Sequence, residues 1–344
     1  MLKSLIWAGG FALAVIAAPS ALLAQSGLDK LYAEAKKEGE VTWYVAHYDT
    51  AMSERIGKAF TEKHPGVKVN VLKTTAQVAF QRVTQDLKAG DVQCDVLSST
   101  DVGHYVTLKQ QGALEKFRPE NASKMIEAFR GVDPEDFYHV TWAGLTTLSY
   151  NTQKVKPQDA PKNWTDLLDP KWKDQISSGS AQFSGTVGTW TVLMKKLYGW
   201  EFFEKLAKNN PLIGRSIDDT VTMLNAGERS VAVGDAASTL RSAQKGNPLA
   251  LSYPTDGALV LVGPSAVLKG AKHPNAGKLF IEFLMSEDLA RLVAAEYEQA
   301  LRPEVEPPSG MKSLKDIKTV RLSPEEVAEG IPVVRKQWRE TFGN

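Results

Sequence analysis

Cysteine is almost absent from this chain. Cys94 is the only one in 344 residues, and it stands between Gln93 and Asp95. A single cysteine excludes an internal disulfide framework, and it excludes any metal site built from several cysteines. We expect Cys94 to be a small buried residue at the start of a strand.

An excess of charge of either sign is also absent. The 41 basic and 40 acidic residues leave a net charge of +1, and Lys and Arg form no run or stripe. Proteins that bind nucleic acid usually carry a basic patch that attracts phosphates. We therefore expect no nucleic-acid partner.

The sequence motifs that usually carry catalysis are missing. There is no Gly-x-Ser-x-Gly elbow, Walker A loop, dinucleotide fingerprint or His-Glu-x-x-His. The five histidines are scattered, and none pairs with another at metal-ligand spacing. Asp218 and Asp219 are adjacent carboxylates, but they precede Thr220 and a predicted helix, where acidic residues commonly offset the helix dipole. We predict no catalytic residue, no metal and no cofactor, with an unmarked hydrolase as the alternative.

Long hydrophobic runs are lacking except at the N-terminus. There Lys3 precedes an apolar stretch from Leu5 to Leu23 that is rich in Ala, Leu and Val. This layout predicts a secretory signal peptide over residues 1–24, cleaved after about Ala24. A membrane anchor is the alternative, but glycine and proline interrupt the run. A lipoprotein anchor would need a cysteine at the cleavage site, and none is there. We expect the mature chain to be a soluble periplasmic protein.

Short β-prone runs alternate with amphipathic helices in the first half of the chain. The runs are Val41–Val45, Val67–Val71 and Cys94–Leu97, and a helical pattern follows each of them. This alternation predicts a parallel α/β sheet with helices on its faces. Ligands of such sheets gather outside the carboxyl ends of the strands. Two polar loops are expected at that edge: His47-Tyr48-Asp49-Thr50 and Ser98-Ser99-Thr100-Asp101.

The pattern changes in the middle of the chain. Thr141–Tyr150 is a long β-prone stretch, and two prolines follow it. We interpret this stretch as the crossing into a second domain, since the chain length indicates about two domains. A β-rich run at Gly257–Val262 ends that domain, and Ala266-Val267-Leu268 leads back to the first. The proline-containing tail, through residues 324–342, is expected to wrap around the surface.

A segment of small residues opens a predicted helix in the second domain. Ser184-Gly185-Thr186 precedes apolar residues that lie three and four apart, such as Val187, Trp190 and Met194. Such a helix start brings free backbone N–H groups, hydroxyl donors and the positive end of the helix dipole to one point. It therefore suits a small oxyanion. Ser and Thr also cap ordinary helices that bind nothing, so both interpretations stay open.

The order of these features resembles the periplasmic solute-binding proteins of bacterial ABC importers, and most closely the family that includes the ferric-iron-binding proteins. The resemblance covers essentially the whole mature chain. It implies a two-lobed, type II-like periplasmic binding protein fold, in which each lobe is a mixed, mostly parallel sheet flanked by helices and crossing hinge strands join the lobes. The segments that carry it best include Val41–Phe60, Ser184-Gly185-Thr186, Leu224–Glu228 and Ala300–Pro303. The expected lobes are residues 27–145 with 258–305, and residues 146–257 with 306–344.

Departures from the family pattern bear on the ligand. In the iron-binding members a Ser-Gly-Ala at a helix start holds an anion, and Ser184-Gly185-Thr186 matches it. Those members bind iron through two consecutive tyrosines, where this chain has Ala236-Ala237. A family His falls near Tyr48, a family Glu falls near Thr100, and a family Asn is replaced by Asp235. Iron(III) would lose its hard anionic ligands, whereas the anion seat is kept.

We therefore predict a substrate-binding component of an ABC transporter, and not an enzyme. It would act as a monomer and capture a small polar, anionic organic solute, namely a carboxylate, phosphonate or phosphate ester. Closure of the lobes would bury the solute for delivery to a permease in the inner membrane. A ferric-iron-binding protein with non-tyrosine ligands and a secreted hydrolase on the same scaffold are the alternatives. The predicted ligand residues are hydroxyl groups and helix starts, Arg215 as a fork-like partner, and Asp235 for an amine or hydroxyl of the solute: Tyr48, Thr50, Ser98, Ser99, Thr100, Ser184, Gly185, Thr186, Arg215 and Asp235.

Overall fold

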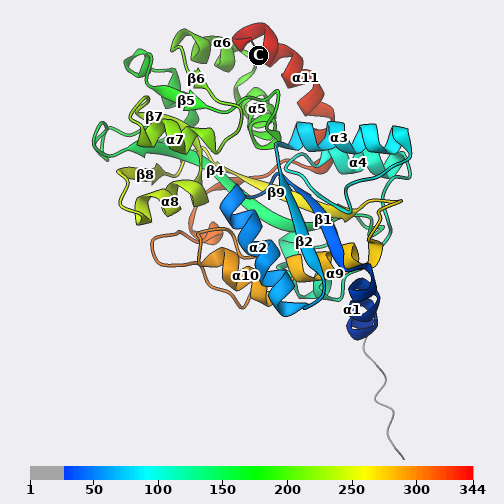
Figure 1. Ribbon diagram of the computed structural model, residues 1–344. Helices are drawn as coiled ribbons and strands as arrows, with labels where there is room; N and C mark the ends of the chain where they lie inside the picture. The colour runs from blue at the N-terminus through cyan, green and yellow to red at the C-terminus, as the bar shows by residue number, and fades with distance from the viewer. Residues whose placement is uncertain (1–26, 344) are drawn as a thin grey trace, which may run out of the picture.

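The computed structural model describes residues 27–343, so the predicted signal peptide lies outside the described residues. Strands and helices alternate along most of the chain (Figure 1). The strands are β1 Glu40–Val45, β2 Lys68–Lys73, β3 Val96–Ser98, β4 His139–Asn151, β5 Ile176–Ser178, β6 Leu212–Ile213, β7 Val231–Asp235, β8 Leu249–Ser252, β9 Ala258–Val267 and β10 Thr319–Val320. The α-helices are α1 Gly27–Glu38, α2 Thr50–Lys63, α3 Ala76–Ala89, α4 Gly103–Gln110, α5 Gly185–Tyr198, α6 Glu201–Lys208, α7 Asp219–Asn225, α8 Ala236–Gln244, α9 Pro274–Leu284, α10 Glu287–Ala294 and α11 Pro324–Phe342.

One mixed sheet of ten strands runs through both lobes, in the order β2-β1-β3-β9-β4-β7-β5-β6, with β10 beside β9 and β8 beside β4. In the first lobe β1 pairs with β2 and with β3, and both pairs are parallel, as the alternation of strands and helices predicts. In the second lobe β5 lies parallel to β6 and to β7. The predicted two-lobed α/β fold is therefore confirmed.

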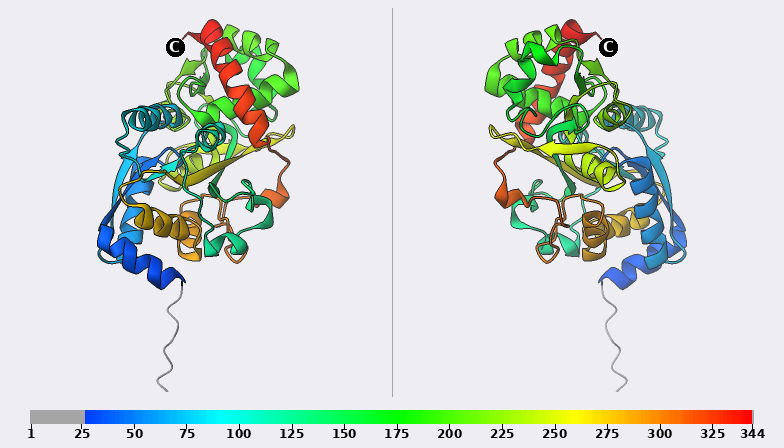
Figure 2. Two further views of the ribbon diagram at one scale, coloured as in Figure 1. Left: turned by 90° about the vertical axis from the view of Figure 1, so that its right-hand side faces the viewer. Right: turned by 90° about the vertical axis from the view of Figure 1, so that its left-hand side faces the viewer.

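The strands β4 and β9 join the lobes. They pair antiparallel from His139 and Ser265 to Thr146 and Leu259, and β4 continues into the second lobe beside β7 and β8. The side views show this strand layer between the lobes (Figure 2). The predicted β-rich run ended at Val262, whereas β9 continues through Gly263-Pro264 to Val267. Proline is tolerated there because β4 is irregular opposite it, and the Pro264 carbonyl accepts from the Ser99 N–H at 3.3 Å.

Aromatic residues fill the core of each lobe. In the first lobe Phe280 packs edge-on against Trp43 and Phe60, with ring centroids 5.0 and 5.1 Å apart. In the second lobe Trp190 of α5 is fully buried and contacts Phe203 edge-on at 5.5 Å. Edge-to-face geometry suits the quadrupoles of aromatic rings, so these contacts fix the helices on the sheet. Cys94 is buried in the core, as expected, although it precedes β3.

Residues 324–342 of the tail form the helix α11. Ser323 caps the helix in a reciprocal capping box with Glu326, and Pro324 occupies the first turn, where proline needs no hydrogen-bond partner. The fully buried Trp338 ties α11 to α5 and α6, and the start of α11 packs against α4. No helix within residues 27–343 is long and apolar enough to span a bilayer.

Candidate functional site

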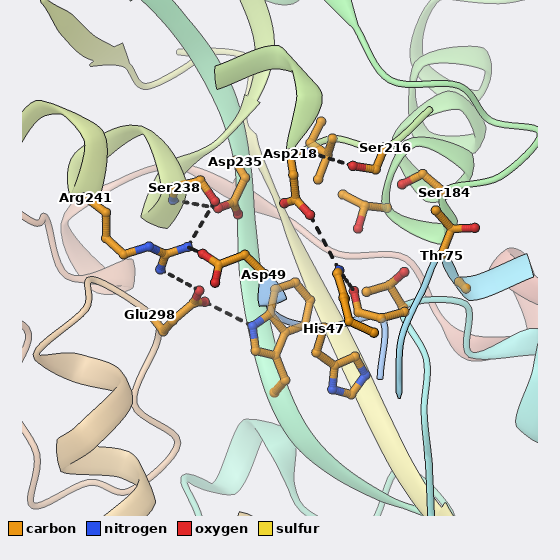
Figure 3. A pocket seen from close by; sticks show the side chains of 17 residues that line it. His47, Asp49, Thr75, Ser184, Ser216, Asp218, Asp235, Ser238, Arg241 and Glu298 are labelled. Carbon is orange, nitrogen blue, oxygen red and sulfur yellow. Dashed lines mark hydrogen bonds and ion pairs between the residues drawn. The ribbon is translucent and has the colours of Figure 1, made fainter. Parts of the chain in front are cut away.

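A narrow cleft lies where the two lobes face each other (Figure 3). Strand ends and helix starts from both lobes form its walls, as expected for a sheet of this kind. Asp49 and Thr75 precede α2 and α3 of the first lobe, whereas Ser184 and Asp235 precede α5 and α8 of the second. Four helix starts therefore point into one small volume, where each contributes the positive end of its dipole.

The four starts differ in how their free N–H groups are satisfied. Asp49 accepts from the Met52 N–H at 2.8 Å, and Asp235 accepts from the Ser238 N–H at 2.8 Å. Ser184 accepts from the Val187 N–H at 3.3 Å. Thr75 makes no capping hydrogen bond, and its buried Oγ1 has no partner among the described residues. The Gln77 N–H of this turn donates to the Phe183 carbonyl, but the start of α3 has no side-chain cap and its Thr75 hydroxyl has no partner, so it is the helix start best suited to hold an anion.

One half of the cleft is rich in hydroxyl groups. Thr75 and Ser184 lie on the same side in Figure 3, and Thr100 and Thr186 also line the cleft. The Lys73 ammonium, at the end of β2, lies 3.5 Å from Asp218 Oδ2 of the other lobe. This half therefore combines hydroxyl groups with one lysine–aspartate ion pair.

The other half of the cleft is acidic and is organised by Arg241 of α8. Its Nη1 lies 2.8 Å from Glu298 Oε1, and its Nη2 lies 3.2 Å from Asp49 Oδ2. Trp142 Nε1 donates to Glu298 Oε2 at 3.0 Å. Burial raises the pKa of Glu298 to about 7, although Arg241 favours its charged form. Burial also raises the pKa of Asp235, which lies on the same side in Figure 3.

A flat aromatic wall separates the two halves. The His47 ring stacks on Trp142 at 5.4 Å with an angle of 17° between the planes. Its Nε2 donates to the Ser99 carbonyl at 2.8 Å, and burial lowers the pKa of His47 to about 3. The imidazole is therefore neutral. Gly263 leaves room for it, because a Cβ at that position would come within 2.4 Å of the ring.

The lobes touch across the cleft, so the structure is a closed form. The Gln77 N–H of α3 donates to the Phe183 carbonyl of the second lobe at 3.3 Å. Gly185 at the start of α5 packs so tightly on the first lobe that a Cβ there would lie 2.8 Å from Thr100 and from the Asp101 N–H. Glycine is needed here for close approach of the two backbones.

Residues 94–327 match a family described as bacterial extracellular solute-binding protein. The chain belongs to this family. A periplasmic protein of Salmonella typhimurium, named as binding 2-aminoethylphosphonate, is 24% identical over 78% of this chain and 77% of its own length. The major ferric iron-binding protein of Neisseria meningitidis serogroup B is 25% identical over 84% of this chain and 89% of its own. Among solved structures, the periplasmic binding protein AfuA of Actinobacillus pleuropneumoniae with bound fructose-6-phosphate has a TM-score of 0.80, at 21% identity, over 88% of this chain and 98% of that one.

Four of the ligand residues predicted for this solute-binding protein line the cleft: Thr100, Ser184, Thr186 and Asp235. Gly185 lies at the lobe contact beside them. Ser98 and Ser99 lie behind the wall, where Ser98 Oγ accepts from Trp43 Nε1 at 2.7 Å and Ser99 Oγ bonds with His104 Nδ1 at 2.8 Å. These two serines are thus engaged in holding the strand ends together.

The other predicted ligand residues lie away from the cleft lining. Tyr48 is buried and borders a separate cavity, and Thr50 is exposed at the start of α2. Arg215 is exposed, and its guanidinium lies over the Phe183 ring at 5.0 Å. The cations that face the cleft are instead Lys73 and Arg241.

Sequence reasoning missed both of these cations. For Lys73 a signal was present, because it follows the predicted strand Val67–Val71 by two residues, at the edge where ligands gather. Arg241 lies within a helix and Glu298 in an irregular segment, and neither has such a signal. Among residues 27–343, no three His, Cys, Asp or Glu side chains are grouped so that they could hold a metal ion.

Proposed function

We propose that this chain is the substrate-binding component of an ABC transporter and captures a small anionic organic solute, namely a carboxylate, phosphonate or phosphate ester. Membership of the solute-binding family and periplasmic relatives support this role and a periplasmic location. In this role the protein closes around the solute and presents the closed form to a permease in the inner membrane.

The unsatisfied start of α3 is the observation that carries the proposal. Thr75 Oγ1 is buried without a partner, and the first N–H groups of α3 have no capping side chain. An unmade hydrogen bond at a buried group costs about 1–3 kcal/mol, so an acceptor at this point would be stabilised. Lys73 and the start of α5 at Ser184 face the same space from two directions. An oxyanion with several acceptor oxygens satisfies all of these donors together.

The acidic half favours a solute with a donor at its other end. Asp235 and Asp49 face the cleft opposite the hydroxyl half, and Asp49 already pairs with Arg241. An amine or several hydroxyl groups would match these carboxylates. The relative named for 2-aminoethylphosphonate binding and the neighbour that holds fructose-6-phosphate are consistent with solutes of this kind.

Calorimetric titration of the mature protein tests the proposal. The panel contains 2-aminoethylphosphonate, ethylphosphonate, fructose-6-phosphate, succinate and ferric citrate. We expect one of the organic anions to bind stoichiometrically, and an added amine or hydroxyl donor to improve its affinity. Lys73→Met should weaken that binding about 10- to 100-fold, the value of a lost charged hydrogen bond of about 1.5–3 kcal/mol. Lys68→Met, on the exposed first residue of the same strand, should leave it unchanged.

Three outcomes would contradict the proposal. Stoichiometric binding of ferric citrate with no response to the organic anions would favour the ferric alternative. Turnover of a bound ester that disappears in Ser184→Ala would identify an enzyme. Binding that is equally strong in Lys73→Met and wild type would show that the anion does not occupy the hydroxyl half of the cleft.

A further inference from the structure

A second polar groove, of about 290 Å³, lies on the outer side of the lobe contact. It is formed where the first turns of α3, the loop before α5 and the last turns of α11 meet (Figure 1). None of its lining residues is acidic: Gln77, Val78, Gln81, Gln182, Phe183, Arg335 and Arg339. The groove shares no lining residue with the cleft described above.

The two arginines of this groove have no direct ion-pair partner among residues 27–343. They lie four positions apart on α11, so they project from one face of the helix and repel each other. Neither forms a direct ion pair with a carboxylate in the described part of the chain, whereas the buried Arg241 and Arg302 both do. The Asp101 carboxylate acts on Arg335 from behind the Gln77 amide. Burial lowers the pKa of Arg335, which reflects the cost of desolvating its charge.

Neutral amides hold the guanidinium groups in place. Arg335 Nη1 donates to Gln77 Oε1 at 3.2 Å, and Arg339 Nη2 donates to Gln182 Oε1 at 3.2 Å. The Gln77 amide is oriented in turn, because its Nε2 donates to Asp101 Oδ2 at 2.7 Å. The N–H groups of Arg335 and Arg339 that make no such bond are therefore preorganised for a ligand. Paired guanidinium forks of this kind match carboxylate oxygens.

We infer that this groove is a second binding site, which takes a ligand with two or more carboxylate groups. Arg335 and Arg339 would hold the carboxylates, while the exposed Gln81 adds an amide donor at the edge. The carboxylates come either from a free polycarboxylate or from an acidic segment of a protein partner. The groove contains residues of both lobes, Gln77 from α3 and Gln182 from the loop before α5, so its ligand would bind the closed form preferentially.

Titration of the mature protein at constant ionic strength tests this site with two probes. One probe is citrate, and the other is a blocked peptide of four glutamates, with a four-glutamine peptide as its control. We expect at least one of the two carboxylate probes to bind, and Arg335→Gln/Arg339→Gln to weaken it at least tenfold. Lys336→Gln removes a charge from the same helix outside the groove and should leave affinity unchanged. If the double variant does not fold, the single variant Arg339→Gln is titrated in its place, since Arg339 is exposed and its substitution should not disturb the fold.

The two probes distinguish the sources of the carboxylates. Binding of citrate points to a free polycarboxylate, whereas binding of the glutamate peptide alone points to a protein segment. The inference is overturned if neither probe binds. It is also overturned if the bound probe is retained by the double arginine variant and lost in Lys73→Met, because the anion then occupies the cleft between the lobes.

Discussion

Glu298→Gln should change how the stability of this protein depends on pH. Glu298 is buried and accepts hydrogen bonds from Arg241 at 2.8 Å and from Trp142 at 3.0 Å. The charged groups that face it are Arg241 of α8, Asp49 before α2 and Asp235 at the end of β7, and burial outweighs the attraction of the arginine. Glutamine imitates the protonated carboxyl group in size and polarity, so the substitution removes the titration and keeps the packing.

The sign follows from the raised pKa. Folded Glu298 has a pKa of about 7, against an ordinary value of 4.5. The folded protein therefore holds this proton more tightly than the unfolded chain does. The stabilisation that results is complete below pH 4.5 and is lost as the pH rises through 7. The difference between the two pKa values corresponds to about 3 kcal/mol of unfolding free energy, at ~1.4 kcal/mol per pH unit.

Urea unfolding at pH 5, 6, 7 and 8 measures this effect. Wild-type stability should fall by about 2.5 kcal/mol more than that of Glu298→Gln over this range. Glu296→Gln serves as the control, since Glu296 pairs with Arg55 at the surface and should retain the wild-type slope. The difference between variants isolates Glu298 from Asp235, whose pKa is also raised. Equal slopes for wild type and Glu298→Gln would refute the assignment.

Three further substitutions test the closed form and the core. Gly185→Ala should weaken solute binding about 5- to 100-fold in calorimetry, because overpacking costs ~1–3 kcal/mol and the new Cβ meets Thr100 only when the lobes close. Gly188→Ala on the same helix is the control and should show no such loss. Arg241→Gln leaves the buried Glu298 unpaired and should destabilise the fold by about 3–5 kcal/mol at pH 8. The loss should be smaller at pH 5, where Glu298 is protonated, and an equal loss at both pH values in urea unfolding would contradict this. Trp190→Ala should cost about 3–5 kcal/mol in the same assay, and a loss below 1 kcal/mol would mean that its aromatic contacts do not stabilise the second lobe.

Local pattern accounts for most of the predicted elements. The strands of the first lobe and the helix after Ser184 follow from the spacing of apolar residues and from capping residues that act within a few positions. The same reasoning ended a β-rich run at Val262, whereas β9 continues to Val267 through Gly263-Pro264, two residues that usually interrupt strands. It also assigned no secondary structure to residues 324–342, which form α11. In both places neighbours from distant parts of the chain supply the missing stabilisation.

The sequence by itself determined the alternation of strands and helices, the polar loops at the strand ends and the cap at Ser184. Each of these depends on the conformational preferences of neighbouring residues. Only the tertiary structure decided which side chains face the cleft. Arg241 meets Asp49 across 192 positions of sequence, and Glu298 joins them from a third segment. Contacts between residues so far apart in sequence depend on how whole helices and strands pack. The apolar cores of both lobes set that packing and so orient these side chains toward one another.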